Sequence, residues 1–267
     1  MKLKHDHIKD GYREVSLSSY RQFQDWVFDV NPGTPAPHTS LVYRGQRRDD
    51  WKLEPTLDRE LRRLHKVKDP SIRKIHLRRF QYAMRGRRGP NPPRDLPDDE
   101  LWALGRHYGL ATPLLDWTAS PFAAAYFAYC EENPSPTGRR CVFALCRTSV
   151  ELTNEKLRKE TAAGGLQRTL EFYRPLTNEN PRLISQAGLF THAPDGVSVE
   201  KWIMQHFKGV TMNVRLYKIT LPETDRETAL RSLNLMNINH LTLFPDAHGA
   251  SEFCNLCLRI AHYAGTC

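Results

Sequence analysis

Residues 107–128 constrain the fold more than any other segment of this 267-residue chain. The segment begins with the polar and aromatic run HYGLATPLLDWTASP and continues with the small-residue run FAAAYFA. The alanines predict a tightly packed helix. The polar groups precede the first turn of that helix, where backbone N–H groups have no partner and an anion is stabilised. The sequence therefore predicts a ligand site at the start of a buried helix.

The rest of the chain mixes helical and strand patterns. Helices are expected at 20–28, 56–86, 97–107, 225–235 and 249–262. Strands are expected at 41–43, 141–146, 214–221 and 239–244, with loops at 31–37 and 90–93. Because helices and strands do not alternate regularly, the pattern favours an α+β fold over a doubly wound one. We expect a single domain over residues 1–267, with an N-terminal helix and loop in 1–40 and an inserted basic helical region in 56–100.

Composition and charge narrow the class of protein. The apolar runs are too short to span a bilayer, and the N-terminus has no apolar secretory region, so we expect a cytoplasmic protein that does not enter membranes. Six cysteines are then expected to stay reduced. Cys254 and Cys257 have the spacing of half a zinc site, and the alternative is that they are buried thiols.

Positive charge is concentrated in residues 71–94, which hold eight of the 39 lysines and arginines and no acidic residue. Such a cluster attracts polyanions at long range and binds phosphates by counterion release. The alternative is a solvated helix face. The candidate nucleic-acid contacts are Arg78, Arg79, Arg85, Arg87 and Arg88.

Several common catalytic motifs are missing from the sequence. It has no Walker loop, no dinucleotide-binding glycine motif, no HExxH and no GxSxG, and no carboxylate cluster has metal spacing, so no metal is expected. Arg44 remains, directly after a predicted strand. A guanidinium there is placed to hold a phosphate, and Gly45 would let the ligand approach the backbone. A structural ion pair is the alternative for Arg44.

Four segments resemble the FRG-domain family, in the same order along the chain. They are YRGQ at 43–46, the run at 107–128, QAGLF at 186–190 and LFPD at 243–246. Tyr43 stands where the family has the phenylalanine that names it. Ala111 to Pro113 stands where the family often has Pro-Thr-Arg. The resemblance covers residues 40–250.

FRG domains are in turn similar in layout to the ADP-ribosyltransferase superfamily. That similarity implies a mixed, split antiparallel sheet and NAD as the cofactor. It places Arg44 against NAD and the second strand's end at Thr118 to Ser120, before the alanine-rich helix. Its third position, usually a glutamate, falls on Gln186.

These resemblances and the residue chemistry give the candidate site. The candidate catalytic residues are Arg44, His107, Asp116 and Gln186. The candidate NAD-binding residues are Tyr43, Arg44, Gly45, Gln46, Tyr108, Thr112, Trp117, Thr118, Ser120, Tyr126 and Phe190. Alternatives stay open: Asp116 as a helix cap, His107 as a core histidine, and Trp117 and Tyr108 as core aromatics.

Cleavage of the nicotinamide–ribose bond builds positive charge on the anomeric carbon, which a carboxylate stabilises. Gln186 brings no charge and cannot act as a base. Gln186 alone would position the ribose, and catalysis would need help from Asp116 or His107. The resemblance, together with the basic residues 71–94, leads us to expect an NAD-dependent ADP-ribosyltransferase acting on RNA or DNA, as an intracellular toxin or defence effector with an antitoxin or chaperone partner. The alternatives are the same activity on protein, and a non-catalytic nucleotide or nucleic-acid binding module.

Overall fold

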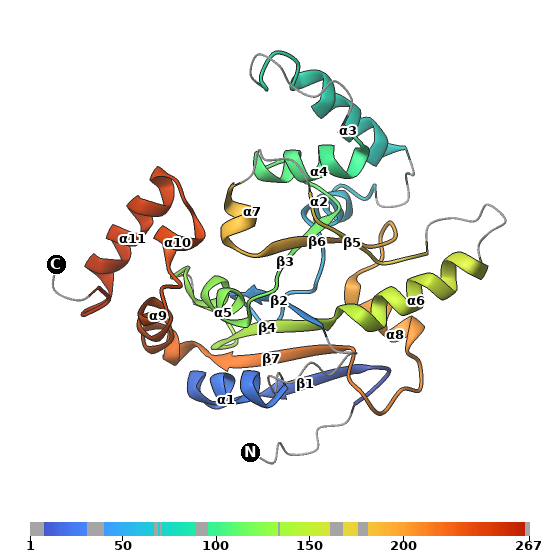
Figure 1. Ribbon diagram of the computed structural model, residues 1–267. Coiled ribbons are helices and arrows are strands. Elements are labelled where there is room, and N and C mark those ends of the chain that lie inside the picture. The colour runs from blue at the N-terminus through green and yellow to red at the C-terminus, as the bar shows by residue number, and fades with distance from the viewer. Residues whose placement is uncertain are drawn as a thin grey trace.

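The computed structural model describes residues 8–30, 40–66, 69, 71–88, 96–132, 134–160, 168–175 and 181–264. The loops predicted at 31–37 and 90–93 lie outside the described residues. Within them, seven strands form one sheet in the order β1-β7-β4-β2-β3-β6-β5 (Figure 1). The strands are β1 (Tyr12–Ser16), β2 (Leu41–Gln46), β3 (Leu114–Thr118), β4 (Arg139–Cys146), β5 (Glu171–Tyr173), β6 (Gly188–His192) and β7 (Leu216–Pro222).

The sheet is mixed, because β1 pairs with β7 in parallel and all other neighbours are antiparallel. The helices are α1 (Tyr20–Val30), α2 (Thr56–Arg63), α3 (Ile72–Ala83), α4 (Asp98–His107), α5 (Pro121–Tyr129), α6 (Arg147–Glu160), α7 (Pro181–Ser185), α8 (Val199–His206), α9 (Arg226–Leu235), α10 (His240–Leu243) and α11 (Ala247–Arg259). The predicted α+β class is confirmed. The region predicted to be helical at 56–86 forms two helices, α2 and α3.

The strand predicted at 239–244 is wrong. Residues 240–243 form α10 instead. The Asn239 side chain accepts a hydrogen bond from the Thr242 backbone N–H, and the Thr242 hydroxyl accepts one from the Asn239 N–H. This reciprocal cap satisfies the first N–H groups of a helix and outweighs the strand-like alternation of apolar residues.

Alternate residues of the central strands face opposite sides of the sheet. Tyr43 and Ala144 face a core built with α1, α5, α9 and α11. Val42 and Phe143 face a second core built with α6 and α8. A third apolar cluster joins α2, α3 and α4 to the β3–β6 side of the sheet. Successive side chains point to opposite faces, and both faces are covered, so β4 is buried along nearly its whole length with its residues divided between two cores.

Helix α5 is the tightly packed helix that the alanines predict. Ala124 and Ala125 are fully buried, and the Ser120 hydroxyl accepts from the Ala123 N–H at 3.1 Å, with Pro121 in the first turn. A Cβ on Gly45 of β2 would lie 1.8 Å from the Ala124 carbonyl oxygen. Gly45 is therefore required because the α5 backbone passes directly over β2, a reason different from the predicted approach of a ligand.

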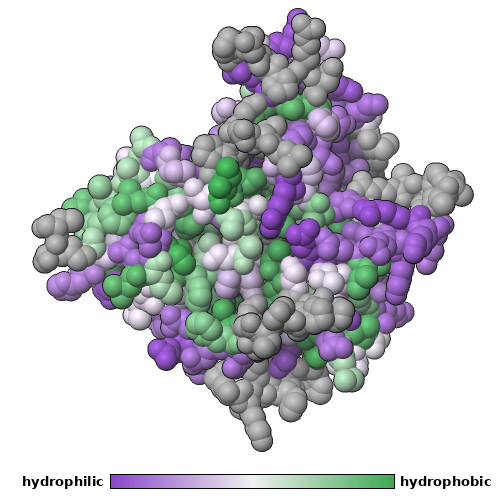
Figure 2. Space-filling view, in the orientation of Figure 1, coloured by the Kyte–Doolittle hydropathy of each residue, from purple (hydrophilic) through white to green (hydrophobic). Residues whose placement is uncertain are grey.

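The basic helix α3 packs on α4, away from the centre of the sheet (Figure 1). Figure 2 shows a hydrophilic surface over this region. Arg73 is buried against Asp58 and Asp195, and so belongs to the packing of the helix. The candidate nucleic-acid contacts Arg78, Arg79, Arg85 and Arg87 are exposed, and Arg88 is partly exposed.

Two further findings bear on the class of protein. None of the helices in the described part of the chain has the length and apolar character that a membrane crossing requires. Among the described cysteines, Cys141 and Cys146 are buried in the sheet, Cys130 is partly buried, and Cys254 and Cys257 are exposed on α11. The interpretation of the latter pair as buried thiols is wrong, because both lie on the outer side of a surface helix.

Candidate functional site

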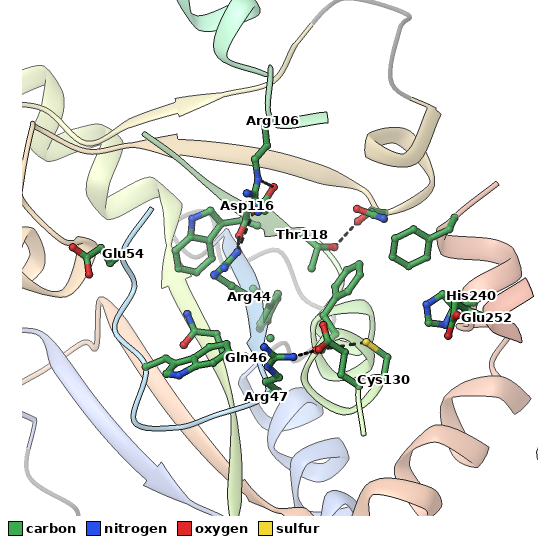
Figure 3. A pocket seen from close by; sticks show the side chains of 18 of the residues that line it. Arg44, Gln46, Arg47, Glu54, Arg106, Asp116, Thr118, Cys130, His240 and Glu252 are labelled. Carbon is green, nitrogen blue, oxygen red and sulfur yellow. Dashed lines mark hydrogen bonds and ion pairs between the residues drawn. The ribbon is translucent and has the colours of Figure 1, made fainter. Parts of the chain in front are cut away.

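A large pocket lies where β2 and β3 part. The two strands share one register pair, Tyr43 with Thr118, whereas β2 pairs with β4 along its whole length. The pocket has a volume of about 1170 Å³. Its walls come from β2, β3 and the segment after β2, from α2 and α4, from the C-terminal end of α5, and from α10 and α11. Figure 3 shows this arrangement.

Arg44 bridges the gap between the two strands. Its Nη1 donates to the Asp116 carbonyl oxygen at 2.8 Å, on the edge of β3 opposite to β6. The guanidinium thus satisfies a backbone acceptor that a continuous ladder would otherwise pair. The same Nη1 lies 3.4 Å from the Asp116 carboxylate, so the structural ion pair considered for Arg44 is present.

Arg106 of α4 completes this cluster. Its Nε and Nη2 donate to the two Asp116 carboxylate oxygens at 3.2 and 2.7 Å. Burial would raise the pKa of Asp116, but the charges of Arg106 and Arg44 outweigh burial and hold this pKa below its ordinary value. Asp116 therefore remains a carboxylate at neutral pH. It does not cap α5, because Ser120 does.

Arg59 and Arg62 of α2 extend the positive charge along the same side. Arg62 binds the Glu54 carboxylate with two nitrogens, and Arg59 donates to the Glu54 carbonyl oxygen at 2.6 Å. We call Arg44, Arg59, Arg62 and Arg106 the arginine wall. Four arginines here face two carboxylates, which leaves an excess of positive charge on this wall of the pocket.

Gln46 adds an unsatisfied acceptor to the pocket. Its side chain is 6% exposed, and its Oε1 has no hydrogen-bond partner among the described residues. Arg44 Nε is likewise a buried donor without a partner there. A buried polar atom without a hydrogen-bond partner destabilises the fold. Both atoms are therefore available to bind a polar ligand or an ordered water molecule.

Gln186 connects β3 to the C-terminal helices. The Thr118 hydroxyl donates to the Gln186 carbonyl oxygen at 2.6 Å, and the Gln186 Nε2 donates to the Leu243 carbonyl oxygen at 3.0 Å. The amide is therefore fixed in the pocket wall by its nitrogen. Its Oε1 is the atom left for a ligand hydroxyl.

The C-terminal wall of the pocket is formed by His240 of α10, by Phe244 directly after it, and by His248 and Glu252 of α11. The His240 ring stacks on Phe244 with centroids 4.9 Å apart, and its Nδ1 shares a hydrogen bond with the Tyr126 hydroxyl. Burial lowers the pKa of His240, and burial raises the pKa of Tyr126. This hydrogen bond therefore joins a neutral imidazole to a protonated phenol.

A third side of the pocket carries Arg47, which is paired with Glu131 and lies 4.9 Å above the centroid of the Trp51 ring. Arg259 of α11 pairs with Glu132 at 3.5 Å nearby. Trp51 is 38% exposed, and the guanidinium groups of both Arg47 and Arg48 lie over its ring.

The structure brings about half of the predicted site residues to the pocket. Those that line it are Tyr43, Arg44, Gly45, Gln46, Asp116, Trp117, Thr118 and Gln186. Trp117 is 3% exposed and donates from Nε1 to the Thr191 hydroxyl at 2.9 Å, so most of its ring belongs to the core.

The remaining predicted residues do not line the pocket: His107, Tyr108, Thr112, Ser120, Tyr126 and Phe190. His107 packs edge-on against the exposed Tyr108 at the end of α4. Thr112 is fully buried, and its backbone holds the start of α2. Tyr126 and Phe190 are core residues. Tyr126 affects the pocket only through its bond to His240.

Sequence reasoning missed Arg106, His240 and Glu252. Arg106 directly precedes the run at 107–128, and no sequence pattern indicates that its side chain pairs with Asp116, ten residues further along the chain. His240 was assigned to a strand that does not exist. Glu252 lay in a helix with no motif of its own.

Comparison with known proteins gives one match. The family model described as the FRG domain matches residues 39–136. No curated protein and no solved structure matches the chain. The matched segment supplies the arginine wall, Asp116 and Thr118, whereas Gln186, His240 and Glu252 lie beyond it. An FRG-like domain over all 267 residues stays a prediction.

Proposed function

Because residues 39–136 match the FRG-domain family model, we propose that the protein binds NAD in the pocket and transfers its ADP-ribose group to a nucleic acid. The observation that carries the proposal is the arginine wall at the point where β2 and β3 part. A pyrophosphate needs several fixed donors and a local excess of positive charge, and arginine supplies both. Arg44 and Arg106 are held in place by Asp116, so a ligand meets a pre-ordered wall.

The volume and the other walls fit the rest of a dinucleotide. A cavity of about 1170 Å³ exceeds the usual range for a drug-sized ligand, which is roughly 300 to 1,000 Å³. Trp51, Phe127 and Phe244 make the pocket lining partly aromatic, which suits a base or a nicotinamide ring. Gln186 Oε1 is placed to accept from a ribose hydroxyl.

The position of α3 supports a nucleic acid as the acceptor. Exposed arginines lie on α3 and on the residues that follow it, and residues 71–88 contain no acidic residue. Phosphate contacts of this kind position a nucleic acid without reading its sequence. Residues 78–88 would hold the polymer while the pocket holds NAD.

The test measures nicotinamide release from NAD by the purified protein, with total RNA, DNA or a cell lysate as the acceptor. Arg44→Ala is expected to weaken NAD binding about 10- to 100-fold, the loss of one or two charge-assisted hydrogen bonds. Arg21→Ala, which removes an arginine that is 81% exposed on α1, is the matched control and is expected to act as wild type. Absence of nicotinamide release with every acceptor overturns the transferase proposal, and NAD binding without release supports a non-catalytic binding module.

The nucleic-acid part is tested separately with the triple variant Arg78→Ala, Arg79→Ala, Arg85→Ala. NAD binding should be unchanged, while affinity for nucleic acid falls. The slope of its salt dependence should become shallower by about 0.7 to 0.9 for each phosphate that the variant no longer neutralises. Label recovered on protein rather than on nuclease-sensitive material would assign the acceptor to protein.

A further inference from the structure

Six carboxylates line the pocket, and five of them form ion pairs with arginines. Five are paired with arginines: Asp116 with Arg106 and Arg44, Glu54 with Arg62, Asp50 with Arg48, Glu131 with Arg47, and Glu132 with Arg259. Glu252 has no lysine or arginine within ion-pair distance in the part of the chain that the structure describes. This carboxylate is therefore the one whose negative charge is not already neutralised.

Ion pairing with an arginine determines which carboxylate is able to act as a general base or as a stabilising anion. The charge of a paired carboxylate is offset by its arginine, and its affinity for a proton is reduced, as the lowered pKa of Asp116 illustrates. A general base must accept a proton from a reacting group, and a stabilising anion must present its charge to the reaction centre. Asp116 is suited to hold Arg44 and Arg106, and unsuited to either task.

Glu252 is half-buried on α11, and one of its oxygens is oriented by its own helix. Oε1 accepts from Asn255 Nδ2 at 3.1 Å. Figure 3 shows Glu252 beside His240, on the opposite side of the pocket from Arg44. His240 stays neutral through its burial, so it does not cancel the charge of Glu252. A ligand that binds the arginine wall through its phosphates and spans the pocket would have its far end on this wall.

We propose that Glu252 is the catalytic base for the transfer, an inference that rests on the proposed function. The bond between the anomeric carbon of the ribose and the nicotinamide nitrogen breaks, and its electron pair leaves with neutral nicotinamide. A hydroxyl or amino group of the acceptor, or water in its absence, forms the new bond to that carbon. The acceptor's proton moves to Glu252 and then to solvent. The charge of Glu252 stabilises the developing cation.

The test compares Glu252→Gln with wild type in two separate measurements. NAD binding, followed by titration calorimetry, is expected to stay within about threefold, because the amide keeps the size of the side chain and the arginine wall is intact. Nicotinamide release is expected to fall about 100-fold or more, the usual contribution of a general base. Glu227→Gln, an exposed residue of α9 paired with Arg231, is the matched control and should retain full activity.

The outcomes separate the two proposals. If wild type releases nicotinamide and Glu252→Gln releases it within about threefold of the wild-type rate, Glu252 is not the base and the transferase proposal stands. Should wild type bind NAD without releasing nicotinamide, both proposals fail together. An equal loss of binding and release in Glu252→Gln also contradicts the inference, because it assigns Glu252 to ligand binding.

Discussion

The two facing walls of the pocket differ in how their charges are used. On the arginine wall, Asp116 and Glu54 are each bound by arginine, and the group is anchored to β2, β3, α2 and α4. On the C-terminal wall, His240 and Glu252 carry no such pairs among the described residues, and His240 is held by aromatic stacking instead. We infer from this difference that the two walls have different roles: the arginine wall binds the phosphates of the ligand, and the C-terminal wall supplies the group that takes part in the reaction.

The strongest destabilisation should come from breaking the packing under the arginine wall. Gly45→Ala places a Cβ 1.8 Å from the Ala124 carbonyl oxygen, so α5 and β2 must separate. We expect a loss of about 3 kcal/mol or more in the free energy of unfolding, the upper range for overpacking. Urea denaturation followed by tryptophan fluorescence measures this loss.

Gly86→Ala is the control for that experiment. Gly86 has a φ of +73°, but a Cβ added to it would meet no other atom of the described residues within 4 Å, so only backbone strain is added. Its cost should be about 1 kcal/mol. Equal losses in the two variants would show that close packing of α5 on β2 is not what Gly45 provides.

A smaller effect is expected from Asp116→Asn, which leaves Arg44 and Arg106 without their shared anion. The loss should be about 1 to 2 kcal/mol, below the range for a fully buried pair because solvent screens a partly exposed carboxylate. Asp50→Asn removes an exposed carboxylate paired with Arg48 and should leave stability unchanged. Denaturation at neutral pH distinguishes the two.

The pH dependence of the Asp116→Asn effect has a definite sign. The pKa of Asp116 in the folded protein lies below its ordinary value, so its ion pairs stabilise the fold above about pH 4. That contribution is lost as the pH falls through the folded-state pKa. The stability gap between wild type and variant should therefore be constant near neutrality and shrink in acid. A gap that widens on acidification would contradict the assigned pairing.

The weakest of these effects is expected at the connection between the walls. Gln186→Leu removes the hydrogen bond from Nε2 to the Leu243 carbonyl oxygen, and this partly buried oxygen then has no donor. We expect about 1 kcal/mol of destabilisation. Thermal unfolding measures it, with Gln24→Leu as a control because its bond to Ser232 is weaker at 3.3 Å and joins two surface helices. No difference between the variants would mean that Gln186 does not fix α10 in place.

Local sequence patterns predicted most elements correctly where their causes were local. Ser120 and Pro121 begin α5, and the small residues Ala123 to Ala125 give it a buried face, as expected. The pattern at 239–244 failed because a side-chain cap between Asn239 and Thr242 outweighed apolar alternation. For the site, the residues in the FRG-like motifs that lie on β2 and β3 reached the pocket. Tyr126 and Phe190 did not, because the faces of their elements that they occupy point into the core.

The α+β class, the start of α5, the FRG-like segment and the selection of Arg44 and Asp116 as candidate site residues all follow from the order of residues in the chain. The pairing of Asp116 with Arg44 and Arg106, and the position of Glu252 on the same pocket, emerged only from the folded arrangement. The physical reason is that helix caps and apolar periodicity act over a few residues, whereas ion pairing depends on which distant strands and helices are brought together. The polar run at 107–128 thus supplies a fixed anchor for one wall, and the unpaired charge comes from a helix more than a hundred residues further along the chain.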